Sequence, residues 1–326
     1  MNLPLPQPRS LPVKPVLRRT WARDADEHAD NLSRWEQVYD QLTSGAFAGA
    51  ITELWLPQTQ VFVETANQTL RQSCAAWPDS IWFGIPAPGA GLMRLGGREI
   101  PAEAVCVRQN GADFDLLTAP DFNLFGIVVE RESFGDYLER VEQRDLDSLL
   151  GRRDLLHLPL HLKTRVCNDL GGILADAGGN SGIDAEQLRQ RLFATLAQIV
   201  SAADRDAENP SARSGFTRQQ RQRIVEQVRD LILHHPDQPM SVPELCERFH
   251  LSRRTLQYCF EDVTGLAPLA YMRAIRLNGV RRQLRDQAVP VGTAAYAWGF
   301  NHLSQFARDY RKQFGELPSQ TSSRES

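Results

Sequence analysis

Two stretches of the C-terminal region carry one residue pattern, 50 positions apart: LSRRTLQYCFEDVTGLAP at 251–268 and NHLSQFARDYRKQFGELP at 301–318. Each stretch has large apolar residues at i and i+4, then a glycine, then a proline. A pattern repeated at a fixed offset indicates a repeated supersecondary unit. The matching positions are Leu256, Phe260, Gly265 and Pro268 in the first stretch and Phe306, Tyr310, Gly315 and Pro318 in the second.

A second apolar stretch precedes each repeat, at 242–249 and at 291–298. Because a turn of only three or four residues separates each stretch from its repeat, the sequence predicts helix, turn and helix, twice. Residues 267–285, which connect the two units, would form a helix about 28 Å long. Such a rod would let the two second helices enter successive major grooves, about 34 Å apart on one face of a duplex.

The outward faces of the two second helices carry arginine and glutamine, which can form bidentate hydrogen bonds with base edges. Ser252 stands at the N-cap position of the first of these helices. Leu256, Cys259 and Phe260 fall on its buried face. The sequence therefore predicts double-stranded DNA as a partner. The candidate DNA-binding residues are Arg253, Arg254, Gln257, Tyr258, His302, Leu303, Ser304, Gln305 and Arg308.

The formal net charge of -3 is unevenly distributed along the 326 residues. Residues 217–326 hold 16 basic and 11 acidic side chains, whereas residues 1–216 hold 21 and 29. A basic C-terminal part suits a polyanionic partner. The five cysteines include no CxxC pair and are odd in number, which predicts reduced thiols and a cytoplasmic protein. The N-terminus lacks the long apolar run of a signal peptide or membrane anchor.

Composition divides the chain into four predicted segments. Residues 1–18, which are rich in proline, are predicted to be a disordered tail. Residues 201–216 contain no large apolar side chain except the Phe at their very end and are predicted to be a linker. Residues 19–200 would form an effector-sensing domain, with homodimerisation left open, and residues 217–326 would form the DNA-binding domain.

Within the predicted sensing domain, Trp35, Val38, Tyr39 and Leu42 have helical spacing and predict an amphipathic helix over 20–45. Short apolar runs between 46 and 130 then predict about eight strands of a β-sandwich or small barrel. The predicted strands are 50–56, 60–64, 70–75, 80–85, 91–95, 104–108, 114–117 and 123–129.

Helical patterns return between 131 and 200. One of them places Leu188, Leu192, Leu196 and Ile199 on a single face, which fits either a core or a dimer seam. The predicted fold class is therefore α+β: a cupin-like N-terminal β-barrel or sandwich with flanking helices, followed by an all-α domain with two helix-turn-helix units.

Particular residue identities accompany the double helix-turn-helix pattern. In the second unit they are Ala295, Gly299, Phe300, Phe306, Arg308, Tyr310, Arg311, Phe314, Gly315 and Pro318. In the first unit they are Leu245, Leu251, Ser252, Arg254, Leu256, Phe260, Gly265, Pro268, Tyr271, Arg276 and Leu277. These residues resemble the AraC/XylS family of bacterial transcription regulators, with departures at Cys246, Gly279 and Thr321. The resemblance implies an operator and RNA polymerase as partners.

Further blocks lie mostly in the N-terminal half: WEQVYDQL at 35–42, LRQSC at 70–74, WP at 77–78, WFGIP at 82–86, SRRTLQ at 252–257 and IRLN at 275–278. They resemble the members of this family that regulate ethanolamine-utilisation operons. The resemblance implies an activator that senses ethanolamine, with adenosylcobalamin as a co-effector and no required cofactor. An AraC-type regulator of another small-molecule pathway is the alternative.

Aromatic and acidic residues of the N-terminal half are candidates for binding an amine effector. Trp77, Trp82 and Phe83 could enclose an ammonium group by cation–π contact. A carboxylate could balance its charge, and the candidates are Glu53, Asp113 and Asp115. The same rings would also fit the core of a barrel, which is the plainer interpretation.

A catalytic barrel is a competing interpretation of the N-terminal half. No histidine occurs between His28 and His157, so the barrel segment lacks the ligands that a catalytic metal needs. We therefore predict neither enzyme activity nor a metal site. A purely architectural DNA-binding protein would not account for a domain of about 180 residues, with a net negative charge, in front of the predicted reader.

Overall fold

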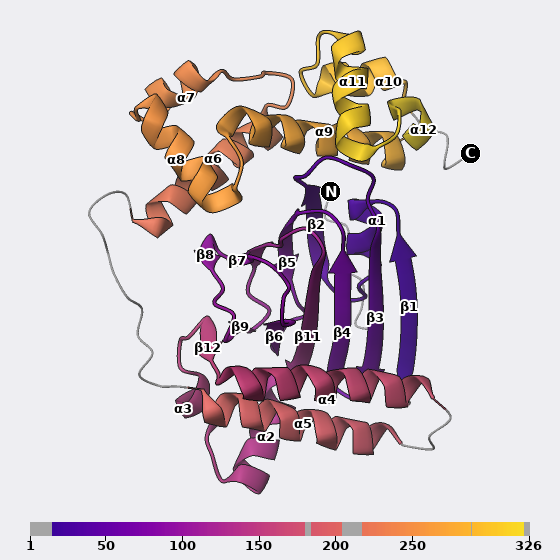
Figure 1. Ribbon diagram of the computed structural model, residues 1–326, viewed down its shortest axis with the longest axis vertical. Helices are drawn as coiled ribbons and strands as arrows, with labels where there is room; N and C mark the ends of the chain where they lie inside the picture. Colours follow the sequence, from indigo (N-terminus) through magenta and orange to yellow (C-terminus); the bar gives the residue numbers. More distant parts are fainter. Residues whose placement is uncertain (1–14, 180–183, 204–216, 288, 323–326) are drawn as a thin grey trace, which may run out of the picture.

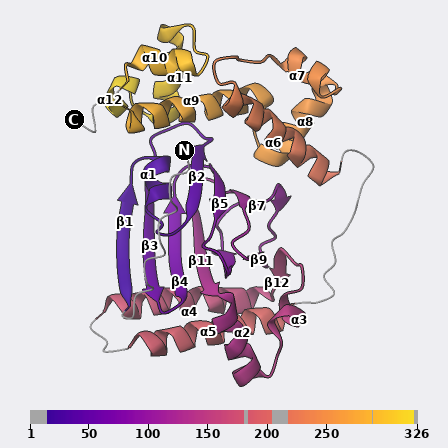
Figure 2. The same cartoon turned by 180° about the vertical axis from the view of Figure 1, so that it is seen from behind.

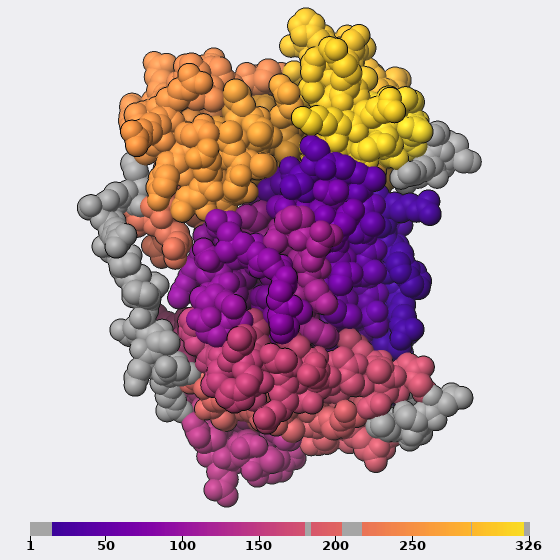
Figure 3. All heavy atoms as spheres, in the orientation of Figure 1, coloured from indigo at the N-terminus to yellow at the C-terminus, as the bar shows by residue number. Residues whose placement is uncertain are grey.

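The computed structural model describes residues 15–179, 184–203, 217–287 and 289–322. Figure 1 shows three layers along the long axis of the molecule. Helices α4 (Leu160–Gly178) and α5 (Ala185–Ala202) lie at one end, two β-sheets occupy the middle, and the helical C-terminal region lies at the other end. Figure 3 shows this C-terminal region seated directly on the sheets. We call residues 15–203 the sensor and residues 217–322 the reader, after the functions that the sequence analysis expects of them.

The sensor contains two antiparallel sheets. The first has the order β1-β3-β4-β11-β6-β9-β12 and the second the order β2-β5-β10-β7-β8. Their strands are β1 (Val16–Ala22), β2 (Glu36–Gln41), β3 (Gly49–Leu56), β4 (Thr59–Ala66), β5 (Leu70–Ala75), β6 (Ser80–Pro86), β7 (Arg94–Leu95), β8 (Arg98–Glu99), β9 (Ala104–Gln109), β10 (Phe114–Leu117), β11 (Phe122–Glu130) and β12 (Leu155–His157).

The α+β class with an N-terminal β-domain and a helical C-terminal region is confirmed. Of the two predicted β-architectures, the described strands form a sandwich of two sheets and not a closed barrel. All eight predicted strands are present, although the predicted strand at 91–95 is paired only at Arg94–Leu95. These runs were visible in the sequence because alternating or continuous apolar residues between turn residues are a local signal.

The helix predicted over 20–45 is wrong. This segment forms β1, the short helix α1 (Ala25–Asp30) and β2. Trp35 and Tyr39 are four residues apart, a spacing that fits one face of a helix and also one face of a strand. The segment forms a strand because it pairs with a part of the chain about thirty residues further on. Strand β2 pairs with β5, from Glu36 opposite Ala75 to Gln41 opposite Leu70.

Neighbouring residues of the first sheet enter different cores. Side chains alternate between the two faces of a strand. In β6, Phe83 faces a core shared with α4 and α5, whereas Trp82 faces the second sheet. The predicted stripe Leu188, Leu192, Leu196 and Ile199 on α5 is fully buried in the first of these cores. Of the two interpretations of that stripe, core packing is therefore confirmed and the dimer seam is wrong.

The remaining sensor elements pack at the same end as α4 and α5 (Figure 2). They are α2 (Arg131–Tyr137), the π-helical turn Leu138–Glu142 and α3 (Leu146–Leu150). The predicted tail lies outside the described residues up to position 14, and its last residues belong to β1, which begins at Val16. The predicted linker lies outside the described residues from 204 onward. None of the described helices is long and apolar enough to cross a membrane.

The reader consists of two helix-turn-helix units that share one long helix, as the sequence predicted. Its elements are α6 (Arg218–His234), α7 (Val242–Arg248), α8 (Arg253–Thr264), α9 (Pro268–Asp286), α10 (Val291–Ala297), α11 (Leu303–Phe314) and α12 (Pro318–Ser322). Tyr271 and Ile275 of α9 enter the core of the first unit, and Leu277 and Val280 enter the core of the second. One rigid helix therefore sets the relation between the two units.

Candidate nucleic-acid interface and effector site

Helices α8 and α11 are each twelve residues long and end in the same way. At the start of α8, the backbone N–H of Thr255 donates to the Ser252 hydroxyl at 3.1 Å, so the predicted N-cap is confirmed. At the C-terminal ends, Gly265 and Gly315 adopt left-handed φ angles of 73° and 75°. Glycine accommodates this conformation without a steric cost, and this explains the repeated glycine of the sequence pattern.

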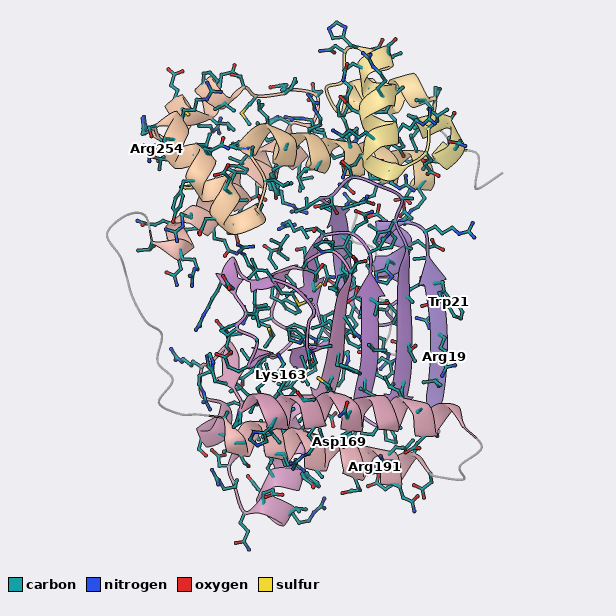
Figure 4. All side chains as sticks on the ribbon, in the orientation of Figure 1. Arg19, Trp21, Lys163, Asp169, Arg191 and Arg254 are labelled. Atoms are coloured by element: carbon teal, nitrogen blue, oxygen red, sulfur yellow. The ribbon has the colours of Figure 1, made fainter. Side chains whose placement is uncertain are left out.

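The outer face of α8 is available to a partner. Arg253, Arg254 and Tyr258 are exposed and Gln257 is half-buried. Figure 4 shows Arg254 on the outer side of the reader, pointing away from the sheets. The Gln257 amide donates to the Glu261 carboxylate at 2.6 Å. The Arg221 guanidinium lies 5.4 Å from the centre of the Tyr258 ring, which holds that ring against α6.

The outer face of α11 has a related arrangement. His302, Leu303, Ser304, Gln305 and Arg308 are all exposed. The Gln305 amide donates to the Asp309 carboxylate at 2.8 Å, and Arg308 donates to the Gln305 side-chain oxygen, also at 2.8 Å. In both units a glutamine is therefore oriented by an acid four residues further along the helix. The structure gathers the nine candidate DNA-binding residues on two exposed helix faces.

The candidate effector residues do not gather in one place. Trp82 lies between the sheets and stacks on Phe114 with ring centres 4.3 Å apart. Phe83 is fully buried on the opposite face of the sheet, so the two rings cannot enclose one ligand. Trp77 is half-buried, and its ring lies 6.4 Å from that of Trp55.

Of the three candidate acids, Asp113 is exposed in a loop and Asp115 is paired with Arg71 at 2.6 Å. Glu53 is buried between the sheets, but its carboxylate already accepts hydrogen bonds from Ser33, Trp55 and Gln60 and pairs with Arg18. A carboxylate with four donors has little capacity left for a ligand. Glu53 is therefore occupied in joining the segment before β2, through Ser33, to β1, β3 and β4 of the first sheet.

A second inter-sheet carboxylate, Glu64 on β4, has His28, Tyr39 and Gln72 as polar partners and pairs with no arginine or lysine among the described residues. It is 1% exposed, and its Oε1 atom lies 3.1 Å from His28 Nε2 and 3.4 Å from the Gln72 amide nitrogen. His28 is fully buried on α1, and neither ring nitrogen makes a well-aligned hydrogen bond with any described residue. Burial, reinforced by the negative charge of Glu64, raises the pKa of the Tyr39 hydroxyl well above its usual range. We call His28, Tyr39, Glu64 and Gln72 the inter-sheet cluster.

None of the four residues of the inter-sheet cluster is among the candidate effector residues predicted from the sequence. A signal was present, since Gln60, Phe62 and Glu64 alternate along one strand, and polar residues recur at positions that turn out to face inward. Whether a given face of a strand is buried depends, however, on how the strand pairs and on which element packs over that face. The sequence alone did not reveal that.

Comparison with known proteins agrees with the geometry of the reader. Residues 245–324 match a family described as a helix-turn-helix domain. The XylDLEGF operon transcriptional activator 2 of Pseudomonas putida is 36% identical over 99 residues, covering 29% of this chain and 63% of that protein. The right origin-binding protein of Escherichia coli (strain K12) is 37% identical over 94 residues, covering 28% of this chain and 32% of that protein.

Among solved structures, a probable AraC family transcriptional regulator from Rhodopseudomonas palustris CGA009 is 36% identical, covering 31% of this chain and 96% of that one, with a TM-score of 0.29. The matched segment spans between 32% and 63% of the length of the two curated relatives. The similarity to these relatives thus covers less than a third of this chain.

Proposed function

We propose that this chain, a helix-turn-helix regulator of the AraC/XylS type, is an effector-dependent activator that binds an operator through α8 and α11. The observation that carries the proposal is the pair of twelve-residue helices with exposed Arg and Gln side chains, both packed on α9. The Pseudomonas putida relative is a transcriptional activator by name, which favours activation. Activation implies RNA polymerase as a further partner.

Base contacts would come from the forked donors of these helices. Arginine pairs well with guanine, and glutamine with adenine, across the major groove. Gln257 and Gln305 each donate to an acid four residues further on, which restricts how their amides can turn. A preoriented amide loses less side-chain entropy on binding than a free one. Both units therefore suit direct base reading.

Selection from a library of randomised DNA duplexes, with the intact chain as bait, would test this function. We expect a selected sequence with two half-sites whose centres lie about ten base pairs apart, because α9 holds the two units as one rod. Inserting five base pairs between the half-sites should abolish binding, since it turns one half-site to the opposite face. Selection of a single short site, or of no sequence, would contradict the proposal.

We further propose that the sensor binds a small amine, with ethanolamine the first candidate, at the inter-sheet cluster. Glu64 supports this choice because it is a buried carboxylate with few partners. Cation–π contact contributes about 0.5 to 2 kcal/mol, whereas micromolar affinity needs about 8 kcal/mol. A buried carboxylate paired with the ammonium group would supply much of the remainder. Adenosylcobalamin is proposed as a co-effector on the strength of the sequence resemblance.

Calorimetric titration of the intact protein with ethanolamine, adenosylcobalamin and both together would test the effector. We expect Glu64→Gln to abolish binding of ethanolamine and Asp113→Asn, at an exposed acid, to leave it unchanged. If none of the three titrations shows binding, the named effectors are wrong and the DNA-binding function still stands. Equal binding of ethanolamine by both variants would show that the inter-sheet cluster is not the effector site.

A further inference from the structure

A buried network of ion pairs joins the sensor to the helix that the two reading units share. Arg281 pairs with Asp24 and is only 5% exposed. Arg282 donates to Asp26 at 2.6 Å and to Asp40 at 2.5 Å. Arg285 lies 3.6 Å from Asp24. We call these three arginines of α9 and three aspartates of the sensor the interdomain clasp. Buried ion pairs hold their elements in a definite relative position, since a lone buried charge is costly.

The end of β2 contacts both reading units beside the clasp. The Asn278 side chain of α9 exchanges two hydrogen bonds with the backbone of Gln41, at 2.9 and 3.0 Å. The Gln313 amide of α11 donates to the Gln41 carbonyl at 2.9 Å. Asp40 lies 3.6 Å from Arg229 of α6, so three reader helices meet this one strand end. A shift of β2 would therefore change contacts with both reading units.

The two sensor elements that carry the clasp also carry half of the inter-sheet cluster. On α1, Asp26 faces the reader while His28 faces Glu64. On β2, Asp40 faces the reader while Tyr39, its neighbour, is buried against His28 with ring centres 6.0 Å apart. The Tyr39 carbonyl itself accepts a hydrogen bond from Arg282 at 2.8 Å. Cluster and clasp residues are therefore adjacent on β2 and separated by only Glu27 on α1.

We propose that α1 and β2 form a relay, through which occupancy of the inter-sheet cluster resets the interdomain clasp and so the position of α9, with both reading units, on the sensor. The relay rests on the proposed effector site. His28 and Tyr39 act as positioning residues, since their side chains act on α9 through Asp26, Asp40 and the Tyr39 carbonyl. Coupling of this kind needs a contiguous packed path with two arrangements. The path here is Glu64, then His28 and Tyr39, then Asp26 and Asp40, then Arg282.

A double-mutant cycle on the intact chain tests the relay without any ligand. Glu64→Gln alters the cluster and Asp26→Asn alters the clasp, while Asp113→Asn, at an exposed acid outside both, is the control. We expect Glu64→Gln to change affinity for the selected operator at least fivefold in the wild-type and Asp113→Asn backgrounds, and less than twofold in the Asp26→Asn background. Additive effects, or no effect of Glu64→Gln, would overturn the relay.

Hydrogen exchange supplies a readout that does not depend on DNA binding. We expect Glu64→Gln to increase backbone exchange in residues 278–286 of α9 but not in α5, and Arg282→Lys, which keeps the charge but loses the forked donor, to remove that difference. Unchanged exchange at 278–286 would overturn the relay even for protein that binds no operator. Failure to bind any operator, with altered exchange at α9, would instead count against the proposed function alone.

Discussion

At the scale of single residues, the reading faces differ in how free their donors are. Arg254 makes no ion pair with any described residue, whereas Arg308 donates a hydrogen bond to Gln305. A guanidinium without such a partner can pair with a guanine directly, but a paired one must first exchange its partner. We therefore expect the first unit to contact bases more readily than the second.

Replacing Arg254 or Gln257 by alanine should weaken specific binding to the operator by about 1 to 3 kcal/mol, because each replacement removes one bidentate base contact. Both side chains lie on the outer face of α8, so the fold should be unaffected. The measurement is a binding titration at matched salt, with Arg191→Ala as the control, since Figure 4 places Arg191 at the far end of the molecule. Unchanged affinity in both variants would remove α8 from base reading.

Asp26 should make stability depend on pH. Burial raises its pKa from the usual 3.8 to about 7, Arg282 opposes that shift and Asp24 adds to it. Because the folded chain holds this proton more tightly, Asp26 stabilises the fold fully below about pH 4 and loses that contribution as the pH rises through about 7. Burial alone would raise the pKa of Asp24 and Asp40, but neighbouring arginines outweigh it and lower both pKa values. These two aspartates therefore stabilise the fold at neutral pH and lose that contribution only as the pH falls below the usual pKa of aspartate.

We therefore expect the unfolding free energy of the wild type, relative to Asp26→Asn, to be larger at pH 5 than at pH 8. Denaturant unfolding of both proteins at the two pH values measures it. Asp113→Asn, at an exposed side chain, should show no such difference. An equal difference between wild type and Asp26→Asn at pH 5 and pH 8 would exclude Asp26 as the titrating group.

At the scale of elements, α9 contains a glycine near its centre for a packing reason. A Cβ atom on Gly279 would lie 2.2 Å from the Trp298 ring, so any side chain there would overlap the indole. The helix is nevertheless continuous from Pro268 to Asp286. The flexibility that a glycine brings is offset by the aromatic ring packed onto it, and the Gln283 side chain accepts a hydrogen bond from that indole at 3.2 Å.

Gly279→Ala should destabilise the protein by about 1 to 3 kcal/mol through overpacking, although alanine is the better helix former by about 1 kcal/mol. Gly171→Ala is the matched control, because Gly171 lies within α4 and a Cβ there would meet no atom within 4 Å. That replacement should stabilise by up to about 1 kcal/mol. Thermal or denaturant unfolding checks both, and stabilisation by both replacements would contradict the packing explanation.

At the scale of the whole molecule, the sensor contributes a residue to the hydrophobic core of the reader. Leu42, which follows β2, is 4% exposed and belongs to the same core as Ile224, Leu256 and Phe260. With the interdomain clasp beside it, this makes the two domains one packed structure. The reader should therefore depend on the sensor for part of its stability.

Leu42→Ala should destabilise the reader by about 2 to 5 kcal/mol, the range for removing a buried leucine side chain. Hydrogen exchange resolved by segment should show faster opening in α6 and α9 than in α4 and α5. Leu160→Ala, at a side chain that is 56% exposed, should have little effect on either. Equal acceleration in the reader and in α4 and α5 would mean that Leu42 serves the sensor core and not the reader.

The sequence by itself determined the reader and most of the strands. The repeat is visible when residues 251–268 are compared with residues 301–318. The Ser252 cap and the closing glycines are local signals, since each depends on residues within about one helical turn. The strands between 46 and 130 are equally local, because strand patterns are read over a few residues. Exposed Arg and Gln on α8 and α11 followed from helical periodicity alone.

Only the tertiary structure decided β2, the inter-sheet cluster and the interdomain clasp. The identity of β2 depends on pairing with β5, some thirty residues away, and the separation of Trp82 from Phe83 depends on which layer covers each face of the sheet. Asp24 and Arg281 are 257 positions apart, and nothing local to either predicts the other. Contacts across such distances arise from the register and packing of whole elements, and residue patterns within a short window do not encode them.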